Sequence, residues 1–141
     1  MSSSTRFSVA IHILALISIN SGGTNTSQYL AESVNTNPVV IRRIVGMLKN
    51  KGLVKVHPGI AGAELSKSIS DITLFDVYQA VSIDADKELF SVHDNPNPLC
   101  PVGKNIQSTI TPLFATAQSA LEKALSHVTI EDIVNDIKSK T

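Results

Sequence analysis

The chain is poor in cysteine, in aromatic residues and in net charge. It has 141 residues with a single cysteine and no tryptophan, and its 12 basic residues are balanced by 12 acidic ones. One thiol cannot form a disulfide within the chain, so we expect a cytoplasmic protein and not a secreted one. A net charge of zero gives no general argument for binding nucleic acid, so such an argument must rest on local charge.

Long apolar runs and catalytic motifs are also missing. The longest nearly apolar run, residues 9–19, is too short to span a bilayer, and we expect no membrane partner. This run predicts a buried helix over residues 6–20, with His12 as a core histidine. The sequence has no Cys-x-x-Cys pair, no phosphate-binding glycine-rich loop and no clear nucleophile–base pair. We therefore do not expect an enzyme, a hypothesis that would rest on Cys100 alone.

One stretch carries the signals for both ends of a helix and a basic face between them. Asn37 is suited to cap the N-terminus, Pro38 is tolerated at the first helical position, and Gly52 follows the last turn. These signals predict a helix over residues 38–51. One face of it is apolar, and the rest holds four basic residues and no acidic one. The apolar residues are Ile41, Ile44, Val45 and Leu48, and the basic ones are Arg42, Arg43, Lys49 and Lys51.

The flanking segments complete the pattern of a winged helix. A shorter helix is predicted over residues 28–34 with Ser27 as its cap, and a polar turn joins it to the basic helix. Alternation over residues 53–57, a turn over 58–63 and a return over 64–66 predict a β-hairpin. In this arrangement the basic helix would enter the major groove, and the hairpin would reach the DNA beside it. The hairpin glycines allow backbone to approach phosphate closely.

Two short helices in the C-terminal half have the same capping signal. Thr73 and Asp76 predict a capping box for a helix over residues 74–82. Thr129 and Asp132 predict another for a last helix over residues 130–138. The polar stretch between the first of these helices and residue 99 has no clear period, so we expect it to be irregular.

A long helix is predicted to start after Cys100 and to continue to about residue 126. Pro112 falls inside it, so we expect a kink or a restart there. A long apolar stripe has little of its own chain to pack against, so we expect a homodimer, with packing on the first helix as the alternative. The stripe consists of Ile106, Ile110, Leu113, Ala117, Ala120, Leu121, Ala124 and Leu125.

The order of these parts and several local strings resemble the Rrf2 family of bacterial transcription regulators. The strings are residues 7–14, 48–54, 59–65 and 72–81, and the tail segment 93–103 is most similar to the YwnA-like branch. The resemblance covers nearly the whole chain. It implies a homodimer that binds double-stranded DNA at a pseudo-palindromic operator through two winged helices.

The resemblance also implies the DNA contacts by position. Many family members have an arginine in the wing, where this chain has His57 and Pro58, so His57 or the backbone at Gly59 would take its place. Val39 and Val40 suit contacts with thymine methyl groups, although one of them could pack under the turn. The expected DNA-binding residues are Ser27, Gln28, Thr36, Asn37, Val39, Val40, Arg42, Arg43, Lys49, His57 and Gly59.

The chain departs from the iron–sulfur members of that family. They have three cysteines between the fourth helix and the long helix, whereas this chain has Glu88 and Asp94 at two of the positions and Cys100 at the third. Carboxylates are poor cluster ligands compared with thiolates. We therefore expect no iron–sulfur cluster and no other cofactor.

Cys100 has three interpretations. It is an inert, half-buried residue, or a redox-sensing thiol whose pKa is lowered by the helix N-terminus and Lys104, or a metal ligand together with His93 and Asp94. A sensing thiol would have to pair across a dimer, with another protein or with a small thiol, because the chain has no second cysteine.

The sequence therefore predicts a mainly α fold with a small β-hairpin: a winged helix-turn-helix DNA-binding domain plus a long C-terminal dimerisation helix. We expect a winged-helix domain over residues 1–83, a connecting sensor loop over 84–101, and the dimerisation and last helices over 102–141. The predicted function is a DNA-binding transcriptional regulator acting as a repressor, with redox gating through Cys100 as a further hypothesis. The alternative is a winged-helix module that binds proteins and not DNA.

Overall fold

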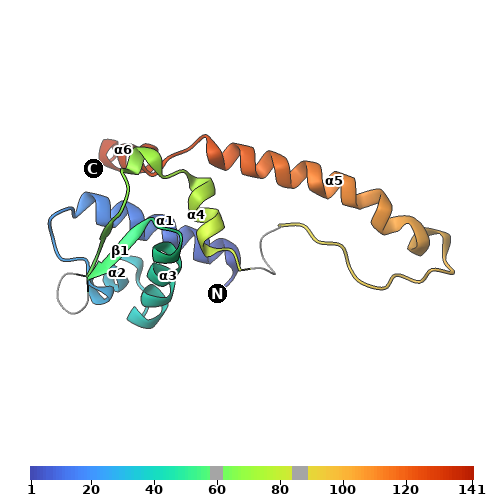
Figure 1. Ribbon diagram of the computed structural model, residues 1–141, viewed down its shortest axis with the longest axis horizontal. Helices are drawn as coiled ribbons and strands as arrows, with labels where there is room; N and C mark the ends of the chain where they lie inside the picture. The colour runs from blue at the N-terminus through green and yellow to red at the C-terminus, as the bar shows by residue number, and fades with distance from the viewer. Residues whose placement is uncertain (58–61, 84–88) are drawn as a thin grey trace.

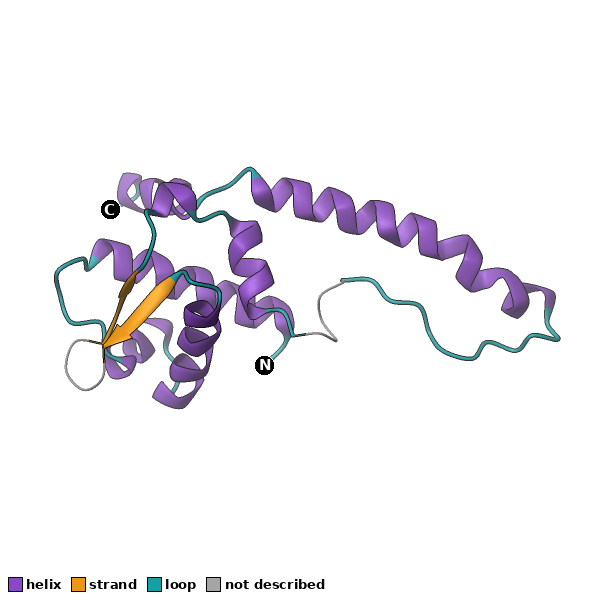
Figure 2. Ribbon diagram, in the orientation of Figure 1, coloured by secondary structure: helices purple, strands orange, loops and turns teal. Residues whose placement is uncertain are grey.

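The computed structural model describes residues 1–57, 62–83 and 89–141. Over these residues it is mainly helical with one two-stranded antiparallel sheet, so the predicted fold class is confirmed (Figure 2). No helix in these ranges is both long and apolar enough to cross a membrane. The elements are α1 (Ser3–Ile19), α2 (Ser27–Val34), α3 (Pro38–Asn50), β1 (Val54–His57), β2 (Gly62–Leu65), the 3-10 helix η1 (Ile69–Asp71), α4 (Leu74–Val81), α5 (Pro101–Ser126) and α6 (Ile130–Ser139).

Helix α1 is the centre of the hydrophobic core. Its residues Ile13 and Leu14 are fully buried, and α2, α3, α4 and α6 all pack against it. It begins at Ser3, three residues earlier than predicted, because the Ser2 side chain caps it by accepting a hydrogen bond from the Thr5 backbone N–H at 3.2 Å. The polar first residues therefore belong to the helix.

His12 was wrongly predicted to lie in the core. It is exposed, and its Nε2 lies 2.8 Å from the Ser33 Oγ of α2. The physical reason is the helical period: Ser8, His12 and Ile19 fall on one narrow face of α1 that points to solvent. The sequence did not reveal this exposed face, because most residues around His12 are apolar.

The buried Arg6 joins α1 to α4. Its side chain is only 8% exposed, and its Nε donates a hydrogen bond of 2.7 Å to the carbonyl oxygen of Val81, the last residue of α4. A cation at a helix C-terminus also interacts favourably with the helix dipole. This contact ties the first turn of α1 to the last residue of α4.

The β-hairpin is anchored to the loop between α1 and α2. Strand β1 pairs antiparallel with β2, and Lys55 lies opposite Glu64. The return strand begins at Gly62, two residues earlier than predicted, because the Ala63 N–H donates to the Asn25 carbonyl at 2.9 Å and holds this end of the strand in place. Residues 58–61 lie outside the described residues.

Both predicted capping boxes are confirmed. In α4 the Thr73 and Asp76 side chains each accept a hydrogen bond from the other's backbone N–H, at 3.0 Å in both directions. Thr129 and Asp132 do the same at the start of α6. Helix α6 packs on α1, and its Ile130 belongs to the core. The packing therefore places α6 within the winged-helix body.

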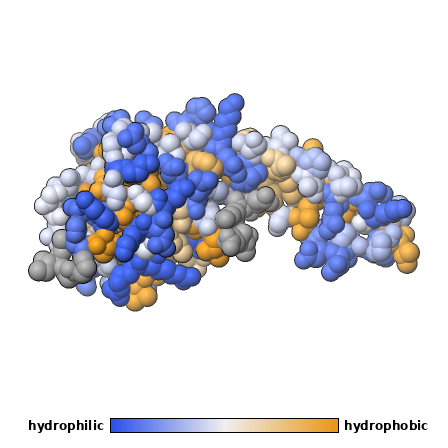
Figure 3. All heavy atoms as spheres, viewed as in Figure 1, coloured by the Kyte–Doolittle hydropathy of each residue, from blue (hydrophilic) through white to orange (hydrophobic). Residues whose placement is uncertain are grey.

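Helix α5 extends from this body as a long arm (Figure 1). It is one continuous helix that passes through Pro112, so it does not restart there. Its main packing partner is α4, not α1. Much of its apolar stripe remains open, with Leu113 64% exposed, and hydrophobic surface is visible along the arm (Figure 3).

Candidate nucleic-acid interface

Helices α2 and α3 form a helix-turn-helix whose ends are set by local hydrogen bonds. Thr26, and not Ser27 as predicted, caps α2: its side chain accepts from the Tyr29 N–H at 3.1 Å. Residue 26 has an extended backbone, whereas Ser27 is already helical and half-buried, so only the Thr26 hydroxyl can reach that N–H. Asn35 then ends α2 in a left-handed conformation, with φ of 65°.

The predicted ends of α3 are confirmed. The Asn37 Oδ1 accepts a hydrogen bond from the Val40 N–H at 3.0 Å, and Pro38 is the first helical residue. Gly52 has a φ of +81°, and the following Leu53 N–H donates to the Leu48 carbonyl at 3.0 Å. This is the left-handed C-terminal motif that a glycine favours. The helix ends at Asn50, one residue before the predicted end.

The basic face of α3 lies open to solvent. Arg42, Arg43 and Lys49 are exposed, and no side chain in the described part of the chain pairs with any of them. Lys51 differs, because its Nζ donates to the Gln79 Oε1 of α4 at 3.1 Å. Figure 3 shows hydrophilic side chains gathered over this region. Three cations of α3 are thus available to an anionic partner.

The other candidates on the helix pair divide into exposed and packed positions. Val39 is 65% exposed, whereas Val40 packs against the core, so Val39 is the one open to a thymine methyl. Gln28 at the start of α2 is exposed, and Thr36 in the turn is half-buried. Helices α2 and α3, which carry or flank these positions, pack against each other.

The hairpin adds a charged cluster that the sequence did not reveal. The Glu64 Oε1 lies 2.7 Å from the His57 Nε2 and 3.3 Å from the Lys55 Nζ. The bonds from His57 and then Lys55 lower the pKa of Glu64 below its ordinary value. The two-residue alternation places Lys55 and His57 on one face, but the position of Glu64 depends on the register between strands. Gly59 lies outside the described residues.

Cys100 is the N-cap of α5 and is exposed. The half-buried interpretation was therefore wrong. The backbone N–H groups of Gly103 and then Val102 lower the pKa of the thiol, which is the expected effect of a helix start on a thiolate, although the sulfur makes no capping hydrogen bond. Among the residues that the structure describes, no group of three or more His, Cys, Asp or Glu side chains could hold a metal ion.

The segment before Cys100 is held against the first turns of α5. The Cys100 N–H donates to the Asn97 carbonyl at 3.2 Å, and the Gln107 Nε2 donates to the His93 carbonyl at 2.7 Å. Gly103 is part of this contact, since a Cβ there would overlap the Asn97 carbonyl oxygen and lie 3.1 Å from the Asn97 nitrogen. Any enlargement of the Cys100 side chain would therefore take place beside a tightly packed turn.

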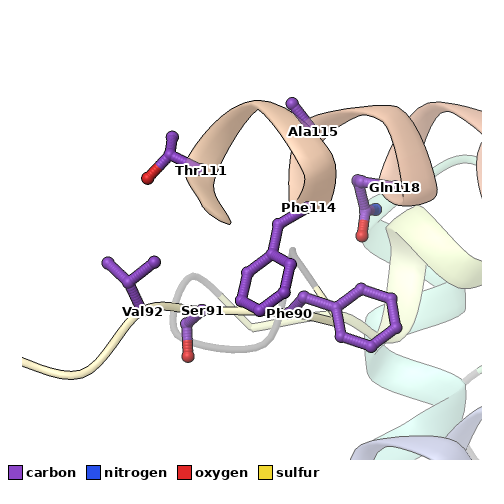
Figure 4. Close-up of a pocket in the computed structure, with 7 residues that line it drawn as sticks. All are labelled: Phe90, Ser91, Val92, Thr111, Phe114, Ala115 and Gln118. Atoms are coloured by element: carbon purple, nitrogen blue, oxygen red, sulfur yellow. The ribbon is translucent and has the colours of Figure 1, made fainter. Parts of the chain in front are cut away.

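A small cavity lies between the same segment and the middle of α5. Figure 4 shows Phe90 from the segment and Phe114 from α5 side by side, and their ring centroids are 5.4 Å apart. The cavity measures about 280 Å³ and ends at Gln118, whose Oε1 accepts a hydrogen bond from the Leu89 N–H at 3.0 Å. Sequence periodicity could not predict this cavity, because the segment has no regular structure.

The family can now be assigned by comparison. The Rrf2 family, described as iron-dependent transcriptional regulators, matches residues 3–136. The chain belongs to the Rrf2 family. It is 44% identical to YwnA of Bacillus subtilis, a candidate HTH-type transcriptional regulator, over 133 residues that cover 94% of this chain and 97% of that protein. The chain is therefore a helix-turn-helix transcriptional regulator, and the expected resemblance is confirmed.

Solved structures agree with this assignment. A candidate DNA-binding protein is 40% identical with a TM-score of 0.73, and the match covers 91% of this chain and 97% of that one. A candidate transcriptional regulator from Lactobacillus plantarum is 26% identical with a TM-score of 0.76, covering 94% of this chain and 89% of that one. Both combine the same helix-turn-helix, hairpin and long helix.

The residues of this chain do not fit the iron that the family description names. An iron–sulfur cluster is held mainly by cysteine thiolates, and the sequence supplies one thiol, Cys100. Asp94, at a second aligned position, is an exposed carboxylate, and Glu88 lies outside the described residues. Membership of the family therefore does not bring the cluster chemistry with it.

Proposed function

We propose that this regulator is a repressor that binds a pseudo-palindromic DNA operator as a homodimer. The observation that carries the proposal is the face of α3, where Arg42, Arg43 and Lys49 are exposed and Val39 lies at the start of the same helix. Arginine can bind guanine with two hydrogen bonds, and a lysine can hold a phosphate. With no acidic residue on the helix, nothing on α3 itself repels DNA.

The remaining contacts surround this helix. Four residues beside α3 would bind phosphate and so fix the register of α3 in the groove: Ser27 and Gln28 at the start of α2, and Thr36 and Asn37 in the turn. In the hairpin, His57 is the contact next to the DNA backbone, and Gly59, outside the described residues, would offer its N–H. Val40 contributes by packing under the turn and so holding Val39 outward.

Dimerisation occurs through α5. Its apolar residues lie at helical spacing, and Leu113 remains 64% exposed in the single chain. A second copy of the same helix would cover this stripe and place two α3 helices at a fixed spacing, as a two-fold operator requires. Light scattering should give the mass of two chains for the natural protein and of one chain for Leu113→Glu.

Cys100 gates the repressor by oxidation. Its thiolate attacks one sulfur of a small-molecule disulfide; a new S–S bond forms, the reagent's S–S bond breaks, and its second sulfur leaves as a thiolate. The exposed position and lowered pKa of Cys100 support this step. The adduct would disturb the turn at Asn97 and Gly103, which lies at the end of α5 far from the DNA-binding body (Figure 1), and with it the packing of the two α5 helices in the dimer. Two half-sites would then no longer be matched.

DNA binding is tested by fluorescence anisotropy with the DNA upstream of the protein's own gene, over a series of salt concentrations. In a plot of log affinity against log salt concentration, each phosphate that the protein neutralises makes the slope more negative by about 0.9. With three cations on each of two α3 helices, the slope from α3 has a limit of about −5, reached only if all six neutralise phosphates; arginines that bind bases make it shallower. Arg42→Ala together with Arg43→Ala should reduce affinity at least about 100-fold, since each base contact contributes ~1–3 kcal/mol.

The matched control removes two lysines near the C-terminus, Lys138 in the last turn of α6 and Lys140 directly after that helix, by Lys138→Ala and Lys140→Ala. Figure 1 places α6 on the opposite side of the body from the start of α3, so this control should bind DNA as the natural protein does. Full binding by the double arginine variant would show that another surface contacts DNA. If the natural protein binds no DNA even at low salt, the protein-interaction module is the better interpretation.

Redox gating is tested by the same assay after treatment with glutathione disulfide. Oxidation should weaken binding by the natural protein and leave Cys100→Ser unchanged. Mass spectrometry confirms that the adduct has formed. An oxidised natural protein that carries the adduct and still binds with full affinity would contradict the gating.

A further inference from the structure

The solvent face of the hairpin carries one carboxylate between two potential cations. Lys55 and Glu64 are directly opposite each other on β1 and β2, and His57 lies two residues further along β1 on the same face. A single oxygen, the Glu64 Oε1, contacts both the Lys55 Nζ at 3.3 Å and the His57 Nε2 at 2.7 Å. Side-chain exposures of 46–58% show that the cluster faces solvent and is not part of the core.

The stabilisation that this arrangement gives the hairpin is small. Exposed ion pairs contribute little to stability, because water screens them and the side chains lose freedom. Val54 and Ala63, on the other face of the hairpin, are buried and attach it to the core. The three side chains are exposed and can therefore be reached by a partner that approaches the hairpin.

The hairpin lies beside α3, whose basic face is proposed above to bind DNA. Strand β1 packs against α3, and β1 runs toward the side of the body where α3 begins (Figure 1). A phosphate that came to this hairpin would meet Lys55 and His57, the two groups that already bind the Glu64 carboxylate. Phosphate and carboxylate are both anions with oxygen acceptors, so they compete for the same N–H groups.

We propose that Glu64 is an electrostatic brake on DNA binding: it occupies the phosphate-binding groups of the wing and limits the affinity of the regulator for any duplex. The proposal rests on the DNA-binding function proposed above. Binding through the wing requires that Glu64 release Lys55, and the freed carboxylate then repels the DNA backbone. Both effects lower affinity without regard to DNA sequence, because the phosphates carry no sequence information.

The test compares Glu64→Gln with the natural protein by anisotropy on a duplex of random sequence and on the upstream DNA. Glutamine keeps the size and removes the charge. The variant should bind both duplexes about three- to tenfold more tightly at 0.1 M salt, the effect of removing one screened charge near the backbone. The slope of its log affinity against log salt concentration should be more negative by about one, because Lys55 becomes free to neutralise a phosphate.

Two controls make the result specific to this cluster. Glu131→Gln removes the same charge from the start of α6 and should leave both affinities unchanged. Adding Lys55→Ala to Glu64→Gln should remove most of the gain. Circular dichroism and thermal unfolding of each variant exclude a change of fold.

The outcomes separate this proposal from the proposed function. If Glu64→Gln and Glu131→Gln bind DNA equally, or if Glu64→Gln binds more weakly, Glu64 is not a brake. In that case the natural protein would still bind DNA and would still lose binding on replacement of Arg42 and Arg43. A natural protein that binds no duplex at low salt would contradict the DNA-binding function itself.

Discussion

Gly62 lies at the contact that ties the wing to the helix-turn-helix, and replacing it by alanine should damage both. Gly62 has a φ of +68°, which side chains rarely adopt. An added Cβ would overlap the carbonyl group of Asn25 and lie 2.7 Å from the nitrogen of Thr26. All of these are backbone atoms, so no side-chain rotation can relieve the overlap.

The cost of Gly62→Ala has two parts. The left-handed backbone costs a residue with a Cβ about 1–2 kcal/mol. Moving Asn25 away from the new Cβ also breaks the 2.9 Å hydrogen bond from the Ala63 N–H to the Asn25 carbonyl. Both residues are at most 4% exposed, so the unpaired groups cost a further ~1–3 kcal/mol. The free energy of unfolding should therefore fall by about 2–5 kcal/mol.

Urea denaturation followed by circular dichroism measures this change. If the free energy of unfolding falls with urea concentration at the same slope in both proteins, the substitution has changed stability alone. Gly52→Ala is the matched control, because Gly52 also has a positive φ, of +81°, but open space where a Cβ would be. It should lose only the backbone part, about 1–2 kcal/mol. If both variants lose the same stability, the contact between Asn25 and the wing does not exist in solution.

Three further predictions concern α3 and α5. Asn37→Ala should lower the free energy of unfolding by about 1 kcal/mol in urea denaturation, because the Val40 N–H loses its cap. Gly46→Ala should raise it by ~0.5–1 kcal/mol, since Gly46 is inside α3 with nothing within 4 Å of a new Cβ. The alkylation rate of Cys100 should reach half its maximum below the ordinary pH of about 8.5, because its pKa is lowered. Below that pKa the thiol gains a proton and the rate falls about tenfold per pH unit; a midpoint at the ordinary value would argue against a sensor.

The features that the sequence predicted correctly are those that depend on a few adjacent residues. The caps at Asn37, Thr73 and Thr129 each need only a side chain and a backbone N–H three positions away. The exception shows the limit of this reasoning. Thr26 and Ser27 are adjacent hydroxyl residues of nearly equal capping preference, and only the backbone conformation decides between them.

The features that the sequence could not predict depend on how distant segments meet. The contact of Glu64 with Lys55 requires the strand register, and the cavity at Phe90 and Phe114 requires the path of an irregular segment. His12 was misjudged because the sequence does not say which side of an apolar helix remains uncovered. Of the candidate DNA-binding residues, the sequence predicted those on α3 from periodicity but not the charge that opposes them in the wing.

The zero net charge of the chain is consistent with regulated DNA binding once the charges are placed in space. Three basic residues of α3, Arg42, Arg43 and Lys49, have no partner in the described chain, whereas the wing cation Lys55 is paired with Glu64. The groups that attract DNA are therefore concentrated on one helix per chain. A single winged helix on its own would bind DNA weakly. In the proposed dimer, specific binding would depend on both copies of α3 engaging together, because each would supply only a part of the contacts. In the proposed dimer, a change in how the two α5 helices pack, made at the distal end of the arm where Cys100 lies, would separate the two α3 helices from their half-sites. A regulator with a strongly basic surface would remain bound through phosphates alone, and no such change could release it.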